Sequence, residues 1–234
     1  MDDSIVTADK ALRIVAELAS VAAETPDIDD VLRRAVELAI EIVPGCEQAG
    51  ISVLWDGRID TPVSVGDLAQ RCDQIQERIL DGPCIEALLE ADTFRIDDIR
   101  TDDRWPEFAV QAQTAGLGSM LACRLASTSD RLAAVNLYST QLKAFDDISE
   151  SFAIAYATHV GLALGAAERE RNLHAALQSR ELIGQAIGIL MERHRLAARQ
   201  AFDIMVEVSQ RTHVKLRLIA EELVRTGALP DVTD

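Results

Sequence analysis

Three consecutive apolar repeats of helical spacing occupy residues 179–227 of this chain. Each repeat returns every three or four residues, which places its apolar side chains on one face of a helix. Three such helices can pack stripe to stripe, so this segment is predicted to be an all-α three-helix bundle. The stripes are Ile183, Ala186, Ile187, Leu190 and Met191, then Phe202, Met205, Val206 and Ser209, then Leu216, Ile219, Ala220, Leu223 and Val224.

The ends of these helices carry residues that favour helix termination. Thr212 precedes the third repeat and is predicted to be the N-cap of that helix, its hydroxyl oxygen accepting a free backbone amide. Gly227 follows the third repeat, where a left-handed residue commonly ends a helix. Gly184 and Gly188 leave one face of the first helix without side chains. Because glycine within a helix costs about 1 kcal/mol relative to alanine, we expect that face to pack closely against another helix.

A long helix is expected to lead into the bundle, because no proline interrupts residues 148–195. Its apolar residues recur at alternating spacings of four and three, a heptad pattern typical of a coiled coil. We predict a parallel homodimer joined over residues 162–190. The sequence leaves open an amphipathic helix that packs only on its own domain. The seam residues of the predicted dimer are Leu162, Ala166, Leu173, Ala176 and Ile183.

Charge is distributed unevenly along the chain, whose formal net charge is −16. Residues 1–177 contain 15 Lys and Arg against 31 Asp and Glu. Residues 178–227 contain 8 against 6, a net charge of +2, and two aspartates near the C-terminus complete the total. The three-helix segment is therefore mildly basic, while tight non-specific binding to nucleic acid is not expected.

The amino-acid composition excludes several other classes of protein. A hydrophobic fraction of 48% is ordinary for a folded protein and too high for a disordered one. The chain has no run of eighteen apolar residues and no charged-then-apolar leader, so neither a membrane span nor secretion is expected. The four cysteines form no CxxC pair and the four histidines share no metal spacing. We expect no metal site and a cytoplasmic location.

Residues 8–165 mix helical and strand patterns. Asp56 and Gly57 form a strong hairpin signal, and Asp146 or Asp147 is predicted to cap the long helix that follows. The order of elements predicts an α+β domain with an antiparallel sheet flanked by helices. Helices are predicted over residues 8–24, 27–43, 67–80, 83–89 and 104–115, and strands over 46–55, 58–65, 93–96, 117–127 and 131–139.

The three-helix segment also matches a known sequence pattern. The matching positions are Arg180, Ile183, Ala186, Gly188, Leu190-Met191, Ala201-Phe202, Ser209, Lys215-Leu216 and Ala220. In these residues the segment resembles the ANTAR domain, an RNA-binding module of bacterial antitermination regulators. It departs from many members at Ile187, where they carry lysine, and at Ala197 and Ala198, where they carry Ser or Thr.

Seven polar residues of this segment are candidates for contact with RNA. Lys215 and Arg217 lie in the first turn of the predicted third helix. The helix dipole does not favour cations there, but it does favour binding of a phosphate. Gln185 and Gln210 can read base edges in a single-stranded loop. The alternative for each residue is a solvated helix face. The full set is Arg180, Gln185, Arg193, His194, Gln210, Lys215 and Arg217.

The preceding region carries a second resemblance. Its pieces are Gly82-Pro83-Cys84, Asp98, Arg104-Trp105-Pro106, Gly118-Ser119-Met120 and the run from Ala134 to Ser139. Over residues 8–165 these resemble a GAF domain, which implies a sensor whose pocket would include Cys84, Trp105 and Asn136. Members that bind cyclic nucleotides usually carry lysine after the asparagine. Leu137 stands there, so cyclic AMP and cyclic GMP are not expected to bind.

Two other function classes remain open from the sequence. Cys84 stands at a predicted helix start, where the helix dipole lowers a thiol pKa. One GAF-fold enzyme class reduces free methionine sulfoxide with cysteines in a comparable loop, so a thiol redox enzyme is one alternative. A buried structural thiol fits the same position. The other alternative is a protein-binding adaptor whose bundle docks a partner helix.

These observations predict a non-enzymatic regulator with a GAF-like sensor over residues 8–165, a coiled-coil linker over 162–190 and an ANTAR domain over 178–230. The resemblance implies that it binds paired hairpins in nascent mRNA, so that the transcription terminator does not form. A homodimer explains why two hairpins would be bound together. We expect no DNA or membrane partner and no cofactor, apart from an unknown small molecule in the sensor.

Overall fold

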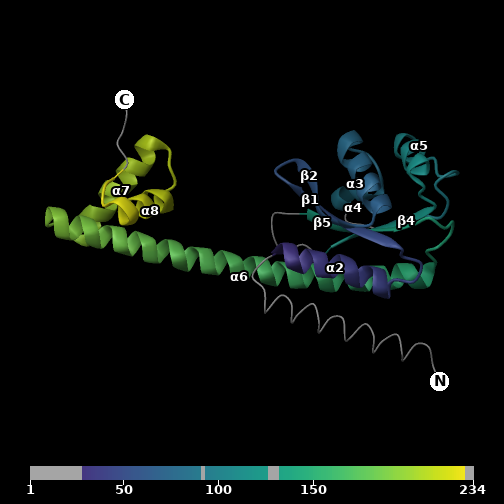
Figure 1. Cartoon of the computed structure of the whole chain (residues 1–234), viewed down its shortest axis with the longest axis horizontal. Helices are drawn as coiled ribbons and strands as arrows, with labels where there is room; N and C mark the ends of the chain where they lie inside the picture. Colours follow the sequence, from purple (N-terminus) through teal and green to yellow (C-terminus); the bar gives the residue numbers. More distant parts are fainter. Residues whose placement is uncertain (1–27, 91–92, 126–131, 230–234) are drawn as a thin grey trace, which may run out of the picture. The chain divides into compact units, whose positions relative to one another are not determined.

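The computed structural model describes residues 28–90, 93–125 and 132–229, and the chain divides into two compact units on either side of Arg169 (Figure 1). The predicted helix over residues 8–24 lies outside the described residues, as do the predicted strand positions 126, 127 and 131. The first unit contains α2 (Ile28–Ile42), β1 (Gln48–Trp55), β2 (Arg58–Val65), α3 (Asp67–Ile79), α4 (Pro83–Glu90), β3 (Thr93–Ile96), α5 (Pro106–Ala115), β4 (Ser119–Arg124), β5 (Leu132–Ser139) and the start of α6 (Asp147–His194).

The first unit is built on a five-stranded antiparallel sheet with the strand order β2-β1-β5-β4-β3. Asp56 and Gly57 join β1 to β2 with φ angles of 51° and 72°. A two-residue turn with both residues left-handed matches the twist of the strands it connects, which is why this sequence forms a hairpin. The predicted hairpin and the α+β class with an antiparallel sheet are confirmed.

Helices cover both faces of this sheet. α3, α4 and α5 lie on one face, and α2 with the start of α6 lies on the other (Figure 1). Successive residues of β5 alternate between the two layers, with Val135 and Leu137 in the α2–α6 layer and Ala134 and Tyr138 in the α3–α5 layer. The hydroxyl of Tyr156 on α6 donates to the carbonyl of Ala35 on α2 and joins the two helices of its layer.

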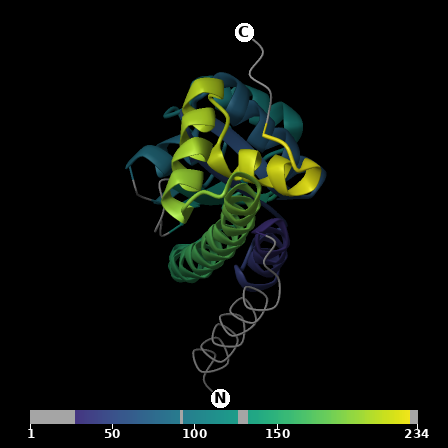
Figure 2. The ribbon, with the colours of Figure 1, turned by 90° about the vertical axis from the view of Figure 1, so that its left-hand side faces the viewer.

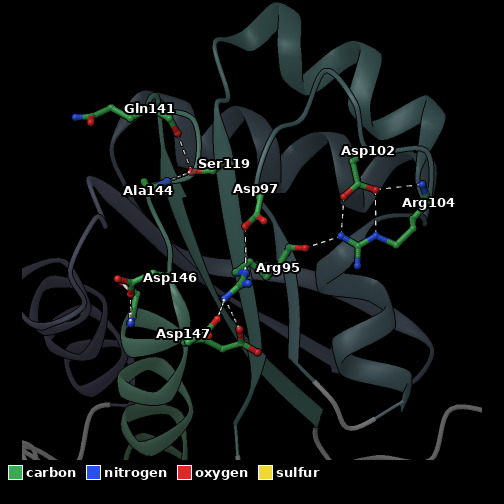
Figure 3. Close-up of polar contacts among 11 residues, drawn as sticks. Arg95, Asp97, Asp102, Arg104, Ser119, Gln141, Ala144, Asp146 and Asp147 are labelled. Carbon is green, nitrogen blue, oxygen red and sulfur yellow. Dashed lines mark hydrogen bonds and ion pairs between the residues drawn. The ribbon is translucent and has the colours of Figure 1, made fainter.

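The first turn of α6 is fixed to the sheet by charged residues. Asp146 is the residue before the helix, and its Oδ1 accepts the backbone amide of Ser149 at 2.8 Å, which confirms the predicted cap. The guanidinium of Arg95 on β3 lies 3.1 Å from Asp97, 3.0 Å from Asp147 and 2.8 Å from Glu150, so edge strand and helix start are linked (Figure 3).

A buried hydroxyl makes two hydrogen bonds to the loop between β5 and α6. Oγ of Ser119 on β4 donates to the carbonyl of Gln141 at 2.7 Å and accepts the amide of Ala144 at 3.2 Å (Figure 3). Ser119 is fully buried, so both its donor and its acceptor capacity are satisfied inside the protein. These contacts fix the chain that enters α6.

The second unit is a bundle of the C-terminal part of α6, α7 (Ala198–Thr212) and α8 (Leu216–Thr226), with α7 and α8 packed over the end of α6 (Figure 2). Arg195, with a φ of 52°, ends α6, and Gly227, with a φ of 73°, ends α8. The predicted all-α three-helix bundle and its terminating glycine are confirmed. The buried core consists of Ala186, Leu190, Ala201, Met205, Ala220 and Leu223.

The packing expected at the two glycines of α6 is not present within the described chain. A Cβ added at Gly184 or at Gly188 would meet no atom within 4 Å. The apolar stripe that faces α7 and α8 lies on a different side of α6, so the described residues do not use the glycine face. That expectation was wrong for contacts within one chain.

Candidate functional site

All seven predicted RNA contacts lie on the surface of the three-helix unit. Arg180, Gln185, Arg193, His194, Gln210, Lys215 and Arg217 are exposed. They come from α6, α7 and α8 and from the turns between these helices, with the buried stripes turned away from them. Exposure permits contact with a ligand, and contacts made within the chain determine how freely each side chain can do so.

Three of these side chains have partners in the chain. Gln185 donates to Glu181 at 3.3 Å, and Arg217 lies 3.8 Å from Glu221. Both are exposed pairs one helical turn apart, which contribute little to stability and give way easily to a ligand. Arg193 differs, because its guanidinium donates to the carbonyl of Gly227 and ties the end of α6 to the end of α8. Arg193 therefore has a structural role of its own.

Lys215 is the N-cap residue of α8, and no side chain caps this helix. The predicted cap, Thr212, is instead the last residue of α7, and its hydroxyl donates to the carbonyl of Val208 at 2.7 Å. His213 in the left-handed conformation, with a φ of 55°, ends α7 and delays the next helix by three residues. The prediction for Thr212 was therefore wrong, and the start of α8 is left without a side-chain oxygen.

Two exposed cationic or titratable residues next to Lys215 were missed from the sequence. Arg211 in the last turn of α7 and His213 after it are exposed. Among the described residues no ion pair involves Arg211 or Lys215. The signal was present in the sequence, since Arg211, His213, Lys215 and Arg217 occupy every second position. We define these four residues as the α7–α8 turn cluster.

The predicted seam residues are mostly exposed. Leu162, Ala166, Leu173 and Ala176 are exposed, with Leu162 at 51% and Leu173 at 61%. Every residue from 169 to 178 is exposed, so α6 lacks a covered side over that stretch of the described chain. Ile183 is half-buried and packs against the core of the three-helix unit. Ile183 therefore differs from the other four predicted seam residues, because the three-helix unit already covers part of its side chain.

A buried polar network lies between the sheet and α3 in the first unit. Asp73 on α3 accepts from Ser64 at 2.6 Å, from Asn136 at 2.9 Å and from the hydroxyl of Tyr138. Asn136 also donates to Ser52 at 3.0 Å. Asp73 is paired with no cation among the described residues, and burial raises its pKa to about 6.

The predicted sensor residues Cys84 and Asn136 belong to this region. Cys84, in the first turn of α4, lies beside Ser52 and Asn136. Burial raises the pKa of its thiol to about 12, although neighbouring hydroxyl and amide groups act in the opposite direction. The expected lowering by the helix dipole is therefore wrong, because loss of hydration outweighs it. The carbonyl oxygen of the Asn136 side chain is buried without a hydrogen-bond partner.

Trp105, the third predicted sensor residue, is enclosed by other side chains. Its ring meets Phe94 edge-on at a centroid distance of 5.8 Å, and the Arg104 guanidinium lies 4.4 Å from the ring centre. Arg104 is itself held by Asp102 at 2.6 Å (Figure 3). Trp105 is 1% exposed and belongs to the same apolar cluster as Cys84, where it acts as core.

The described residues show neither a membrane-spanning helix nor a metal-binding cluster. None of the helices they form is both long enough and apolar enough to cross a bilayer. No group of three or more His, Cys, Asp or Glu side chains among them is arranged to hold a metal ion.

Comparison with known proteins assigns a family to each unit. A GAF domain model matches residues 25–165 and an ANTAR domain model matches residues 171–224. No curated protein matches the chain. The GAF match covers more than half of the chain and extends over the α2–β5 region and the start of α6.

Solved structures share the fold of the first unit. The GAF domain of an Acinetobacter phosphoenolpyruvate-protein phosphotransferase has 15% identity and a TM-score of 0.54, covering 72% of this chain and 97% of that one. A putative GAF sensor protein from Burkholderia vietnamiensis has 16% identity and a TM-score of 0.52, covering 70% and 94%. Free methionine-R-sulfoxide reductase from Neisseria meningitidis, solved with its substrate, has 14% identity and a TM-score of 0.51, covering 73% and 95%.

At these identities the likeness extends to the fold and not to the activity of any of the three proteins. The family matches carry the functional conclusion, because they cover both units. An ANTAR domain implies RNA-binding antitermination regulation and a GAF domain is a sensor. The chain belongs to the GAF domain family and carries a C-terminal ANTAR domain, which makes it a GAF–ANTAR regulator.

Proposed function

We propose that this protein binds tandem hairpins in nascent mRNA as a homodimer joined along α6, and that this binding prevents formation of a transcription terminator. The GAF unit controls binding by shifting the population of RNA-competent dimers. The observation that carries the proposal is the α7–α8 turn cluster, which lies in the mildly basic segment of an otherwise strongly acidic chain.

The cluster has the chemistry of a phosphate site. Lys215 and Arg217 stand at the start of α8, where the positive end of the helix dipole makes cations unfavourable unless an anion is present. Backbone amides at a helix start and nearby cations both attract a phosphate. Arg211 extends the positively charged surface to the last turn of α7, and the exposed imidazole of His213 lies between the two. Gln185 and Gln210 are assigned to base edges in the loops.

Exposure of α6 supports the dimer. An isolated helix is marginally stable in water, and most helices in proteins are held by packing of an apolar face. Residues 169–178 lack such packing within the described chain. Two large apolar side chains of this stretch, Leu173 and Leu177, are 61% and 55% exposed. A second copy of α6 would cover these side chains in a coiled coil. We assign the seam to Leu162, Ala166, Leu173 and Ala176, with Ile183 shared between seam and bundle core.

Two hairpins follow from two bundles. A dimer carries two α7–α8 turn clusters, and linking two binding events makes the second one intramolecular, which raises the overall affinity. Because the acidic first unit repels any long polyanion, specific hairpins must bind far more tightly than bulk RNA does.

Catalysis is not part of the proposal. A thiol acts as a nucleophile in its deprotonated form, and the raised pKa of Cys84 keeps this thiol protonated at neutral pH. Cys84 is also 1% exposed. The similarity to methionine sulfoxide reductases is therefore assigned to the shared fold alone, and the unit to sensing.

Binding of a two-hairpin leader RNA across a salt series tests the function. The Lys215→Glu, Arg217→Glu variant should lose binding while its helical content is unchanged. Each phosphate contact removed lowers the salt slope by about 0.7–0.9 units. The matched control is the Arg33→Glu, Arg58→Glu variant, which changes two exposed arginines of the first unit. It has the same total charge as the Lys215→Glu, Arg217→Glu variant.

Three RNA ligands separate loop recognition from general attraction. The wild-type protein should bind the two-hairpin leader more tightly than one hairpin, and one hairpin more tightly than a leader with scrambled loops. Equal affinity for all three would rule out loop recognition by a dimer. Equal loss of binding in the charge-matched control would assign the effect to net charge and not to the α7–α8 turn cluster.

A further inference from the structure

A groove on the outer side of the GAF unit is lined by charges that the chain does not neutralise. It runs between α3 and α5, which lie side by side over the same face of the sheet (Figure 1). Its volume is about 450 Å³. This groove is separate from the buried network of Asp73, which lies on the inner side of α3.

Two arginines define the electrostatics of the groove. Arg71 and Arg78 are seven residues apart on α3, so their side chains emerge on one face of that helix. Neither forms an ion pair within the described chain, and no Asp or Glu is among the lining residues. In a region that contains 31 acidic against 15 basic residues, an unpaired arginine pair without a carboxylate is unexpected.

One of these arginines is held in position across the groove. The guanidinium of Arg78 donates a hydrogen bond to the Oε1 of Gln111 on α5. This bond uses one nitrogen and leaves the other donors of the guanidinium unassigned among the described contacts. A guanidinium fixed in this way has lost part of its conformational freedom before any ligand arrives, which favours binding of an anion.

The floor of the groove is apolar. Ile75, one turn from both arginines, is nearly buried and forms this floor, whereas Val110 on α5 is 68% exposed and lines the rim. A groove with an apolar floor and two donors at its rim suits a molecule that has both an anionic group and an apolar body. Guanidinium groups bind carboxylate and phosphate with paired hydrogen bonds. Sites for small ligands have volumes of about 300–1,000 Å³, which includes the observed value.

We propose that the α3–α5 groove binds a small amphipathic anion, whose carboxylate or phosphate head lies between Arg71 and Arg78 and whose apolar body lies against Ile75 and Val110. A long RNA backbone is less suited to this groove. Its phosphates would bind the arginines but would make no favourable contact with the apolar floor. Small amphipathic anions are therefore the class of ligand that we assign to the sensor.

The position of the groove connects such a ligand to the interior of the unit. The inner face of α3 carries Asp73, and it also carries Gln76, whose side-chain amide donates to Tyr138 on β5 at 3.4 Å. A ligand that shifts α3 would therefore shift the residues bonded to β5. That the groove is the input which controls RNA binding rests on the proposed function, whereas binding of the anion does not.

NMR titration of the full chain tests the proposal, with hexanoate and phenyl phosphate as probes that carry the two candidate head groups. Backbone amides of α3 and α5 should shift in a saturable way with at least one probe. The Arg71→Gln, Arg78→Gln variant should weaken that binding by about ten-fold or more, as expected for loss of hydrogen bonds to a charged group. Both positions are exposed, so the fold should survive the change. The Arg33→Gln variant, which alters an exposed arginine of α2, should bind as the wild type does.

Comparison of the probes identifies what the groove recognises. Hexan-1-ol and inorganic phosphate should each bind more weakly than the amphipathic anions, because each lacks one of the two features. Equal shifts with hexan-1-ol, or no saturable shift of α3 and α5 with either anion, would overturn the proposal. Shifts of the same amides by the leader RNA, lost in the double variant, would give the groove to RNA and would overturn it too. Failure of the wild type to bind the leader RNA would overturn the proposed function and leave the anion result standing.

Discussion

Replacement of Asp73 by asparagine should remove the contribution of this buried group to the pH dependence of stability in the GAF unit. The carboxyl group is fully buried and no cation faces it among the described residues. Three donors, from Ser64, Asn136 and Tyr138, favour its ionised form, but burial has the larger effect and raises the pKa from 3.8 to about 6.

The direction of the effect follows from proton binding in the two states. Between pH 4 and pH 6 the unfolded chain has lost the proton of Asp73 while the folded chain keeps it. Stability contributed by this group is therefore present at low pH and lost as pH rises through this window. A shift from 3.8 to about 6 corresponds to about 3 kcal/mol of unfolding free energy. The amide introduced by the Asp73→Asn change would remain neutral and would keep an acceptor for Asn136 and Tyr138.

Fluorescence-monitored urea unfolding at pH 4.5 and pH 7.5 measures this difference. Both tryptophans of the chain, Trp55 and Trp105, lie in the GAF unit, so the signal reports on that unit. The free energy of unfolding of the variant relative to the wild type should rise by about 2 kcal/mol between the two pH values, because the unfolded carboxyl is already mostly ionised at pH 4.5. The Asp60→Asn variant, which changes an exposed carboxylate on β2, should show no such rise. A difference between Asp73→Asn and wild type that is the same at both pH values would refute the reasoning.

Three other predictions concern the seam, the start of α6 and the sensor. Leu173→Glu should convert the dimer to monomers in light scattering, while Asn172→Glu, next to it on the same exposed stretch, should leave the dimer intact; a dimer in both would place the interface elsewhere. Arg95→Gln should lower the unfolding free energy by about 1 kcal/mol, because it removes a partly exposed network of three ion pairs, and unchanged stability would mean that these pairs are solvent-screened. Calorimetry should detect no binding of cyclic AMP or cyclic GMP, and micromolar affinity for either would contradict the inference from the absence of lysine after Asn136.

Local sequence rules predicted most of the elements and their ends. The turn at Asp56 and Gly57, the cap at Asp146 and the terminating Gly227 depend on residues a few positions apart. Their conformations are set by backbone sterics and by short-range hydrogen bonds. The cap proposed at Thr212 failed because His213 adopts a left-handed conformation, which is uncommon for residues with a side chain.

The buried network was not predictable from local patterns. Asp73 stands among polar residues of α3 and has the sequence neighbourhood of an exposed carboxylate. Its partners Asn136 and Tyr138 are 63 and 65 residues away in the sequence, and packing of α3 on the sheet brings them together. A Cβ at Gly50 on β1 would lie 2.3 Å from the Asp73 carboxylate, so the sheet leaves room for the group only where this glycine stands. Burial also reversed the expectation for the pKa of Cys84, for the same long-range reason.

The path from sensor to RNA is constrained by α6, the one described helix that belongs to both units. Its first turn is tied to β3 through Arg95 and its next turns pack against α2 through Tyr156. From residue 169 to 178 the helix has no covered face within the described chain. A change in the sheet can therefore shift or tilt the first turns of α6. The exposed stretch transmits that movement as a change of packing only where another helix lies against it. In the proposed function, control of RNA binding through this helix therefore depends on the dimer, and a Leu173→Glu monomer that still responded to the sensor would show that the signal does not travel through α6.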